Sequence, residues 1–84
     1  MTTIEIRQRR DDVHAQIKGM PTHWGCGDTE LTAIGDLAKS HSKYFTLGDG
    51  VAERIKELSN EDVGILIKLL PINFGVNLVY VKTN

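Results

Sequence analysis

Hydrophobic and polar residues alternate at the start of the chain. Ile4 and Ile6 are flanked by polar residues, and this period of two is typical of a half-buried strand. The pattern predicts a strand over residues 2–7. An alternative stays open, because Thr2 and Glu5 have the spacing of a capping box, so that the whole stretch would be one helix.

The spacing of the apolar positions lengthens after residue 8. Val13 and Ile17 lie four positions apart, which places both on one face of a helix, and Gly19 is a residue type that commonly ends helices. The sequence therefore predicts a helix over residues 8–18.

A second amphipathic helix is predicted after Asp28 or Thr29, because either side chain can cap a helix N-terminus. Four residues with helical spacing form its apolar face: Leu31, Ile34, Leu37 and Ala38. The segment 43–47 that follows is rich in aromatic and β-branched residues and predicts a short strand.

Two more helices are predicted in the second half of the chain. The first has one apolar stripe made of Val51, Ile55 and Leu58. Ser59 is the expected N-cap of the second, and Leu58 and Val63 have the spacing of a hydrophobic staple. Residues 63–70 are apolar nearly all round, so we expect this helix at the centre of the core, ended by Pro71.

The C-terminal segment 76–81 predicts a strand that is apolar on both faces, which is usual for strands covered on both sides. A hairpin over residues 64–81, turning at residues 73–75, is the alternative. Pro71 argues against the hairpin, because proline interrupts the hydrogen bonding of a strand.

These elements together predict an α+β fold. We expect one domain over residues 1–84, with three or four helices packed on a small sheet that includes the C-terminal strand. Trp24 is expected to pack beneath its loop. The remaining expected core residues are Leu31, Ile34, Leu37, Ile55, Leu58, Val63, Leu66, Ile67, Leu70, Leu78 and Tyr80.

The length of the chain narrows the expected function. With 84 residues, 40% of them hydrophobic, nearly every apolar side chain is needed for the core. A reaction centre with its own pocket would compete for the same residues. We therefore expect a protein that is not an enzyme and that holds neither a cofactor nor a metal ion.

Cysteine content and hydropathy give an expectation for the compartment. The single cysteine excludes an intramolecular disulfide framework. The start of the sequence lacks the apolar run of a signal peptide, and no window is long enough to span a bilayer. We expect a cytoplasmic protein with no membrane partner.

Residues 21–31 hold the sharpest chemical signal in the chain. Cys26 precedes a predicted helix N-terminus, where a thiol pKa is lowered, and His23 lies three positions earlier. A thiol or metal site at His23 and Cys26 is therefore one hypothesis. A zinc site would also need His14 and His41 to converge from separate elements. The favoured interpretation is a loop in which Cys26 packs as a small apolar residue.

A basic cluster near the N-terminus suggests nucleic-acid binding as an alternative function. Its residues are Arg7, Arg9, Arg10 and Lys18, and such side chains neutralise phosphates. Asp11 and Asp12 follow the arginines directly, so ion pairs on a solvated surface are the favoured explanation.

The favoured function is a small protein-binding module, such as a regulator or inhibitor of a larger protein, or a protein that self-associates. Residues 28–62 carry eight acidic and four basic side chains, a net charge of −4 that would steer a basic partner. The small predicted sheet also has edges that can accept a strand from another chain. The acidic residues expected to bind the partner are Asp36, Glu53, Glu57, Glu61 and Asp62.

Overall fold

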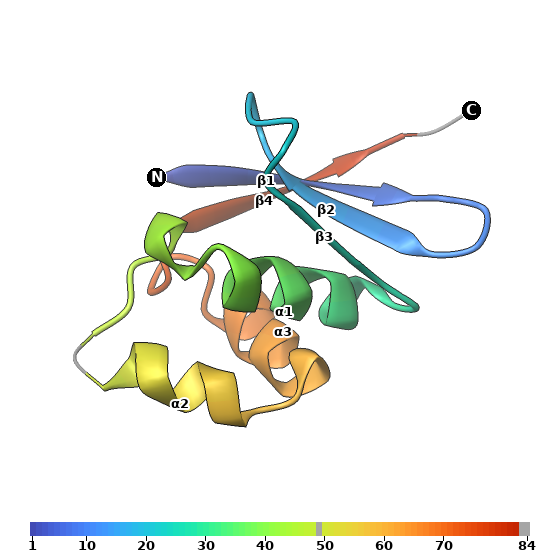
Figure 1. The fold of residues 1–84 in the computed structure, drawn as a ribbon. Coiled ribbons are helices and arrows are strands. Elements are labelled where there is room, and N and C mark those ends of the chain that lie inside the picture. Colours follow the sequence, from blue (N-terminus) through green and yellow to red (C-terminus); the bar gives the residue numbers. More distant parts are fainter. Residues whose placement is uncertain (49, 83–84) are drawn as a thin grey trace.

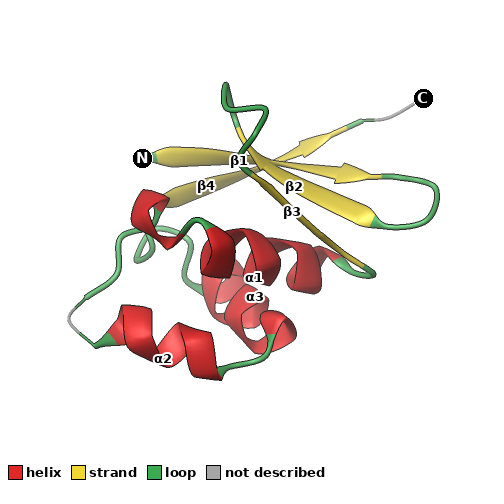
Figure 2. Cartoon of the chain, viewed as in Figure 1, coloured by secondary structure: helices red, strands yellow, loops and turns green. Residues whose placement is uncertain are grey.

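A computed structural model describes residues 1–48 and 50–82, and the fold within these residues is α+β. It contains four strands, three α-helices and one short 3-10 helix (Figures 1 and 2). In chain order the elements are β1 (Thr2–Gln8), β2 (Val13–Ile17), β3 (Trp24–Gly27), α1 (Glu30–Ser40), η1 (Ser42–Tyr44), α2 (Val51–Glu57), α3 (Asn60–Leu69) and β4 (Val76–Val81).

The four strands form one sheet in the order β3-β2-β1-β4. β1, β2 and β3 are consecutive antiparallel neighbours, with Ile6 opposite Ala15 and Ala15 opposite Gly25. β4 returns from the far end of the sequence and pairs parallel to β1. The helices lie on one face of this sheet, so the molecule has two layers (Figure 1).

The strand predicted over residues 2–7 is confirmed as β1, whereas the helix predicted over residues 8–18 is wrong. Val13, Ala15 and Ile17 are all buried, and they alternate with polar neighbours as in a half-buried strand. A spacing of four fits the period of a strand as well as that of a helix, so Val13 and Ile17 alone do not distinguish the two. The chain reverses before β2 in a turn closed by the Arg9 N–H, which donates to the Asp12 carbonyl at 2.8 Å.

Two shorter segments also differ from the prediction. Residues 43–47 form the end of η1 and an extended loop, with Phe45 buried and the Thr46 N–H bonded to the Phe74 carbonyl at 2.9 Å. The segment expected to be a loop contains strand β3. Two of its four residues are glycine, so intrinsic strand propensity gave no signal there.

The predicted starts of α1 and α3 are confirmed. The Thr29 hydroxyl, rather than Asp28, caps α1 by accepting from the Thr32 N–H at 3.2 Å. The Ser59 hydroxyl caps α3 by accepting from the Asp62 N–H at 3.1 Å. The C-terminal region is helix followed by strand, so the hairpin alternative is wrong.

The core lies between the sheet and the helices. Of the predicted core residues, five are buried, namely Ile34, Leu37, Ile55, Val63 and Ile67, and Leu31, Leu58 and Leu78 are partly buried. Three predictions are wrong, because Leu66, Leu70 and Tyr80 are 37%, 47% and 57% exposed. Only one side of α3 is covered, and Tyr80 lies on an edge strand.

A close helix crossing orients α3. A β-carbon at Gly64 would overlap the Leu31 carbonyl of α1, and one at Gly35 would overlap the Asn60 carbonyl of α3. The two glycines let the backbones touch, which fixes the side of α3 that carries Val63, Gly64 and Ile67 against the rest of the protein. The opposite side of α3 therefore faces outward.

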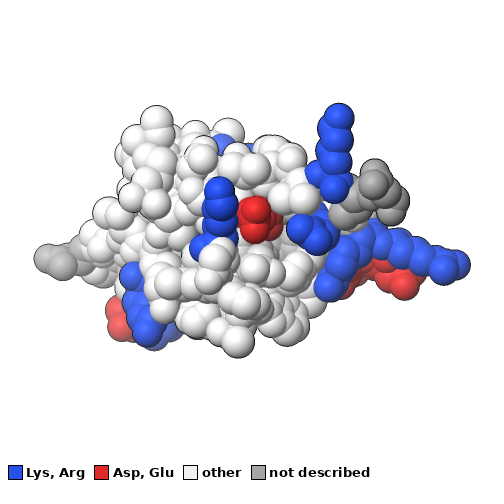
Figure 3. Space-filling view, turned by 90° about the horizontal axis from the view of Figure 1, so that it is seen from above, with Lys and Arg blue, Asp and Glu red and all other residues white. Residues whose placement is uncertain are grey.

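The second face of the sheet has no covering element within residues 1–48 and 50–82 (Figure 1). The expectation that β4 is covered on both faces is therefore wrong for the part of the chain described. Trp24 lies on this uncovered face and is 47% exposed, so it does not plug the core. Figure 3 views the molecule from the uncovered side.

Candidate interaction surfaces

The five acidic residues predicted to bind a partner do not form one surface. Glu53 and Glu57 lie on α2, and Glu61 and Asp62 lie in the first turn of α3, all exposed. Arg54 and Lys56 alternate with the acids on α2 and offset their charge. An acidic docking patch is therefore not what the arrangement favours.

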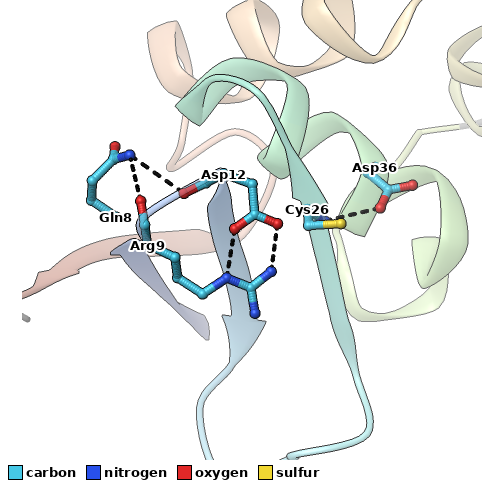
Figure 4. Close-up of polar contacts among 5 residues, drawn as sticks. All are labelled: Gln8, Arg9, Asp12, Cys26 and Asp36. Carbon is cyan, nitrogen blue, oxygen red and sulfur yellow. Dashed lines mark hydrogen bonds and ion pairs between the residues drawn. The ribbon is translucent and has the colours of Figure 1, made fainter.

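Asp36 has a structural contact of its own. Its Oδ2 accepts a hydrogen bond from the backbone N–H of Cys26 at 3.0 Å, which ties α1 to strand β3 (Figure 4). β3 is an edge strand, so this carboxylate occupies an N–H that would otherwise be unpaired.

The basic residues of the alternative hypothesis gather only in part. Arg9 makes two hydrogen bonds of 2.6 Å to Asp12, which lower the pKa of the Asp12 carboxyl and raise that of the Arg9 guanidinium (Figure 4). Arg10 is exposed in the same turn, while Arg7 and Lys18 are exposed on or beside the uncovered face of the sheet. In Figure 3 the basic side chains lie mostly toward one end of this face, with acidic ones among them.

The uncovered face carries a chemically mixed surface. The register places Trp24 beside Gln16, and Gln16 beside Glu5 on the next strand. The rings of Trp24 and His14 lie 5.5 Å apart between centroids. Partial burial, and then the positive charges of neighbouring arginines, lowers the pKa of His14.

The structure does not bring His23 and Cys26 together as a site. Cys26 pairs across the strands with His14, whereas His23 packs against His41, with ring centroids 4.7 Å apart. His23 Nε2 lies 3.1 Å from the Tyr44 hydroxyl. Among the described residues, no three His, Cys, Asp or Glu side chains are placed to hold a metal ion.

An apolar surface on the outer side of α3 was not predicted from the sequence. We call Ile65, Leu66, Leu69, Leu70 and Ile72 the α3 surface. Four of these side chains are exposed, by 37% for Leu66, 71% for Leu69, 47% for Leu70 and 77% for Ile72. The apolar run had suggested a helix buried all round, but Gly64 and Lys68 within it were the available signals that only one side packs inward.

Two shallow pockets border the α3 surface. One, of about 340 Å³, is lined by Leu31, Ile65, Lys68 and Leu69, between α1 and α3. The other, of about 350 Å³, lies between α2 and α3, and its wall includes Ile55, Leu58 and Leu66 with Arg54 and Glu57 among its charged residues. The α3 surface is thus contoured rather than flat.

A third recess lies between the sheet and the start of α1. It has a volume of about 220 Å³, and Tyr80 and Glu30 are among its lining residues. Burial, and then the Glu30 carboxylate, raises the pKa of Tyr80 to about 12. Lys68 forms an ion pair with Glu30 Oε2, while Oε1 is buried and has no hydrogen-bond partner among the residues that the structure describes.

Comparison with known proteins found no matching family, no matching curated protein and no matching solved structure. No helix in the described part of the chain is long and apolar enough to cross a membrane.

Proposed function

We propose that this protein is a non-enzymatic protein-binding module that contacts its partner through the α3 surface. The observation that carries the proposal is the exposure of Leu66, Leu69 and Leu70, which share one side of α3 at helical spacing, and of Ile72 just beyond the end of the helix. Scattered exposed aliphatic residues are ordinary on soluble proteins, but a contiguous group is typical of an interaction site.

The energetics of burial support this assignment. Covering a leucine or isoleucine side chain contributes about 1.5–3 kcal/mol, so a few such contacts supply much of the affinity of a specific complex. The two pockets beside α3 can accept apolar side chains of a partner. Of the predicted acidic set, Glu57 lines one pocket, and Asp62 lies one helical turn before Leu66 on the same side of α3.

The role proposed for such a module is to regulate or inhibit a larger protein. An 84-residue protein that binds through the α3 surface can block a site on its partner. It needs no reaction centre of its own to do so. A cytoplasmic location is part of the same proposal, because the one cysteine, Cys26, is unpaired.

Partner capture with matched variants tests the proposal. Tagged wild-type protein should retain a stoichiometric protein from a native lysate, and the double variant Leu69→Ser, Ile72→Ser should lose it. Both side chains are more than two-thirds exposed, so the variant should fold with nearly unchanged stability. Trp24→Ser, which removes a large exposed side chain on the other layer, is the control and should retain the partner. Equal retention by the double variant would contradict the assignment.

A second candidate function is nucleic-acid binding on the uncovered face of the sheet. The observation that favours it is the exposed Trp24 ring on a face that also carries Arg7, with Lys18 beside it. Aromatic side chains on a sheet stack with bases, and basic side chains neutralise phosphates.

The tryptophan itself reports on this candidate. Trp24 is the only tryptophan, so a single-stranded oligonucleotide that stacks on it should change the intrinsic fluorescence. The change should weaken steeply with salt and should shrink in Arg7→Gln and Lys18→Gln, whereas Lys56→Gln on α2 should match the wild type. Constant fluorescence at low salt would exclude this function.

A further inference from the structure

Strand β4 is an edge strand, and within residues 1–48 and 50–82 no strand pairs with its outer backbone groups. The Thr2 N–H of β1 donates to the Gly75 carbonyl at 2.8 Å. In the parallel register of β1 and β4, this bond determines which alternate residues of β4 direct their backbone groups toward β1. Backbone groups alternate in direction along a strand, so Asn77, Val79 and Val81 bond to β1. Leu78 and Tyr80 therefore direct their N–H and C=O groups outward, away from the sheet.

The two edge strands of the sheet, β3 and β4, differ in how their outer backbone groups are protected. β3 is only four residues long, and the Asp36 side chain occupies the Cys26 N–H on its outer side. β4 has six residues, Val-Asn-Leu-Val-Tyr-Val, with neither a charge nor a proline. Charges, prolines and covering side chains are the usual protections of an exposed edge, and β4 lacks the first two.

Exposed side chains accompany the open edge. Val79 is 38% exposed on the uncovered face, and Tyr80 is 57% exposed on the helix side. In a strand that pairs with another at this edge, both side chains gain cross-strand neighbours. An apolar extended strand would therefore pair with the outward backbone groups of β4 and also cover its exposed side chains.

We propose that β4 pairs antiparallel with β4 of a second copy of this chain, about a twofold axis at Val79. Leu78 then lies opposite Tyr80 of the second copy, and Tyr80 lies opposite Leu78 of the second copy. In each of these two pairs the outward N–H and C=O groups of both residues form hydrogen bonds. The two four-stranded sheets join into one continuous sheet of eight strands.

The strand fits its own copy in this register. Val79 faces Val79 across the axis on the open face, and each Tyr80 ring covers the half-buried Leu78 of the other copy on the helix side. Lys82, the nearest charge along the chain, lies opposite Val76 of the second copy and far from its own counterpart. No like charges are opposed, and the twofold symmetry is that of most homodimers.

Disulfide trapping tests both the pairing and its register. At a non-hydrogen-bonded antiparallel pair the Cα atoms are about 4.5 Å apart, within the range of a disulfide. In a Cys26→Ser background, Val79→Cys should therefore give a covalent dimer under mild oxidation. Val81→Cys is the matched control on the same strand and face. Its counterpart in the other copy lies about 14 Å away, four steps of ~3.4 Å along the strand, so it should not cross-link.

Mixing two variants checks the register independently. Asn77→Cys and Val81→Cys, each in the Cys26→Ser background, should form a mixed disulfide, because these positions face each other across the axis. The proposal is overturned if Val79→Cys cross-links no faster than Val81→Cys, or if neither the homodimer nor the mixed dimer appears.

Association without a covalent bond gives a second measurement. Sedimentation equilibrium of the wild type should show a reversible dimer, and Val79→Lys, which opposes two ammonium groups at the axis, should raise the dissociation constant at least about tenfold. Gln16→Lys, on the same face but in the inner strand β2, should leave it unchanged. A wild type that stays monomeric at millimolar concentration overturns the proposal. These variants spare the α3 surface, so failure here and failure of the proposed function are distinguishable.

Discussion

The backbone N–H of Cys26 in β3 donates a hydrogen bond of 3.0 Å to the carboxylate of Asp36 in α1. Ten residues separate the two along the chain, and between them the chain turns from the sheet layer to the helix layer. The helix lies so close beneath the strand that a β-carbon at Gly25 would overlap the Leu37 backbone. One carboxylate thus fixes the helix to the edge of the sheet.

Replacing Asp36 should cost stability rather than partner affinity. Asp36→Ala removes a hydrogen bond to a charged group, which lowers the free energy of unfolding by about 1.5–3 kcal/mol. Urea unfolding followed by circular dichroism measures the loss. Glu53→Gln, an exposed acid of α2, should stay within about 0.5 kcal/mol of the wild type. A loss no larger than that in Asp36→Ala would show that the hydrogen bond contributes nothing.

The crossing of α1 and α3 should not tolerate a methyl group. Gly64→Ala forces the Leu31 carbonyl away, and overpacking of this kind costs about 1–3 kcal/mol. Gly48→Ala is the matched control, because the nearest atom to its added carbon is a Val51 methyl group at 3.9 Å. Thermal unfolding of the two variants compares them directly, and an unchanged melting temperature for Gly64→Ala would contradict the close crossing.

Sequence pattern was sufficient where an element's own residues determine its form. Ser59 capped α3 as expected, because a serine hydroxyl reaches the backbone N–H three residues on whatever the tertiary context. Alternation and β-branched residues likewise predicted the strand at Ile4 and Ile6 and the C-terminal strand.

Pattern failed where tertiary packing decides. Val13 and Ile17 suit one face of a helix and one face of a strand equally, and only the pairing with β1 and β3 selects the strand. β3 has no propensity signal, because two of its four residues are glycine. A β-carbon at either glycine would overlap atoms of α1, so the close packing of α1 requires them. The α3 surface was mistaken for core, because an apolar run does not reveal how many of its sides find neighbours.

Ile67 and Leu66 should respond very differently to truncation, although they are adjacent in the apolar run. Ile67 is 1% exposed, so Ile67→Ala should cost about 2–5 kcal/mol in unfolding free energy. Leu66 is 37% exposed and borders a pocket, so Leu66→Ala should cost about 1 kcal/mol or less. Urea titrations that give the two variants equal losses would contradict the orientation of α3.

His14 should make the protein less stable in mild acid. Its pKa in the folded state is lowered from 6.5, by burial and by the nearby arginines, so the unfolded chain takes up the proton first. The stability contributed by neutral His14 is present above pH 6.5 and is lost as the pH falls through the folded-state pKa.

A comparison of unfolding free energies near pH 7.5 and pH 5.5 measures this dependence. His14→Gln should show a smaller decrease than the wild type, because it removes the shifted group. Gln16→Asn, a non-titrating substitution on the same face of the sheet, serves as the control and should keep the wild-type decrease. A titration of the His14 ring by NMR with a midpoint above 6.5 would contradict the prediction.

The parallel ladder between β1 and β4 joins Thr2 to Val76, 74 positions along the chain. Such distant contacts form only after a large loop has closed, whereas β1, β2 and β3 can assemble from neighbouring segments. The last strand therefore arrives late on the folding pathway. Until it does, the edge of β1 whose Ile4 and Ile6 N–H and C=O groups pair with β4 stays unpaired, and a newly made chain is most prone to aggregate in that interval.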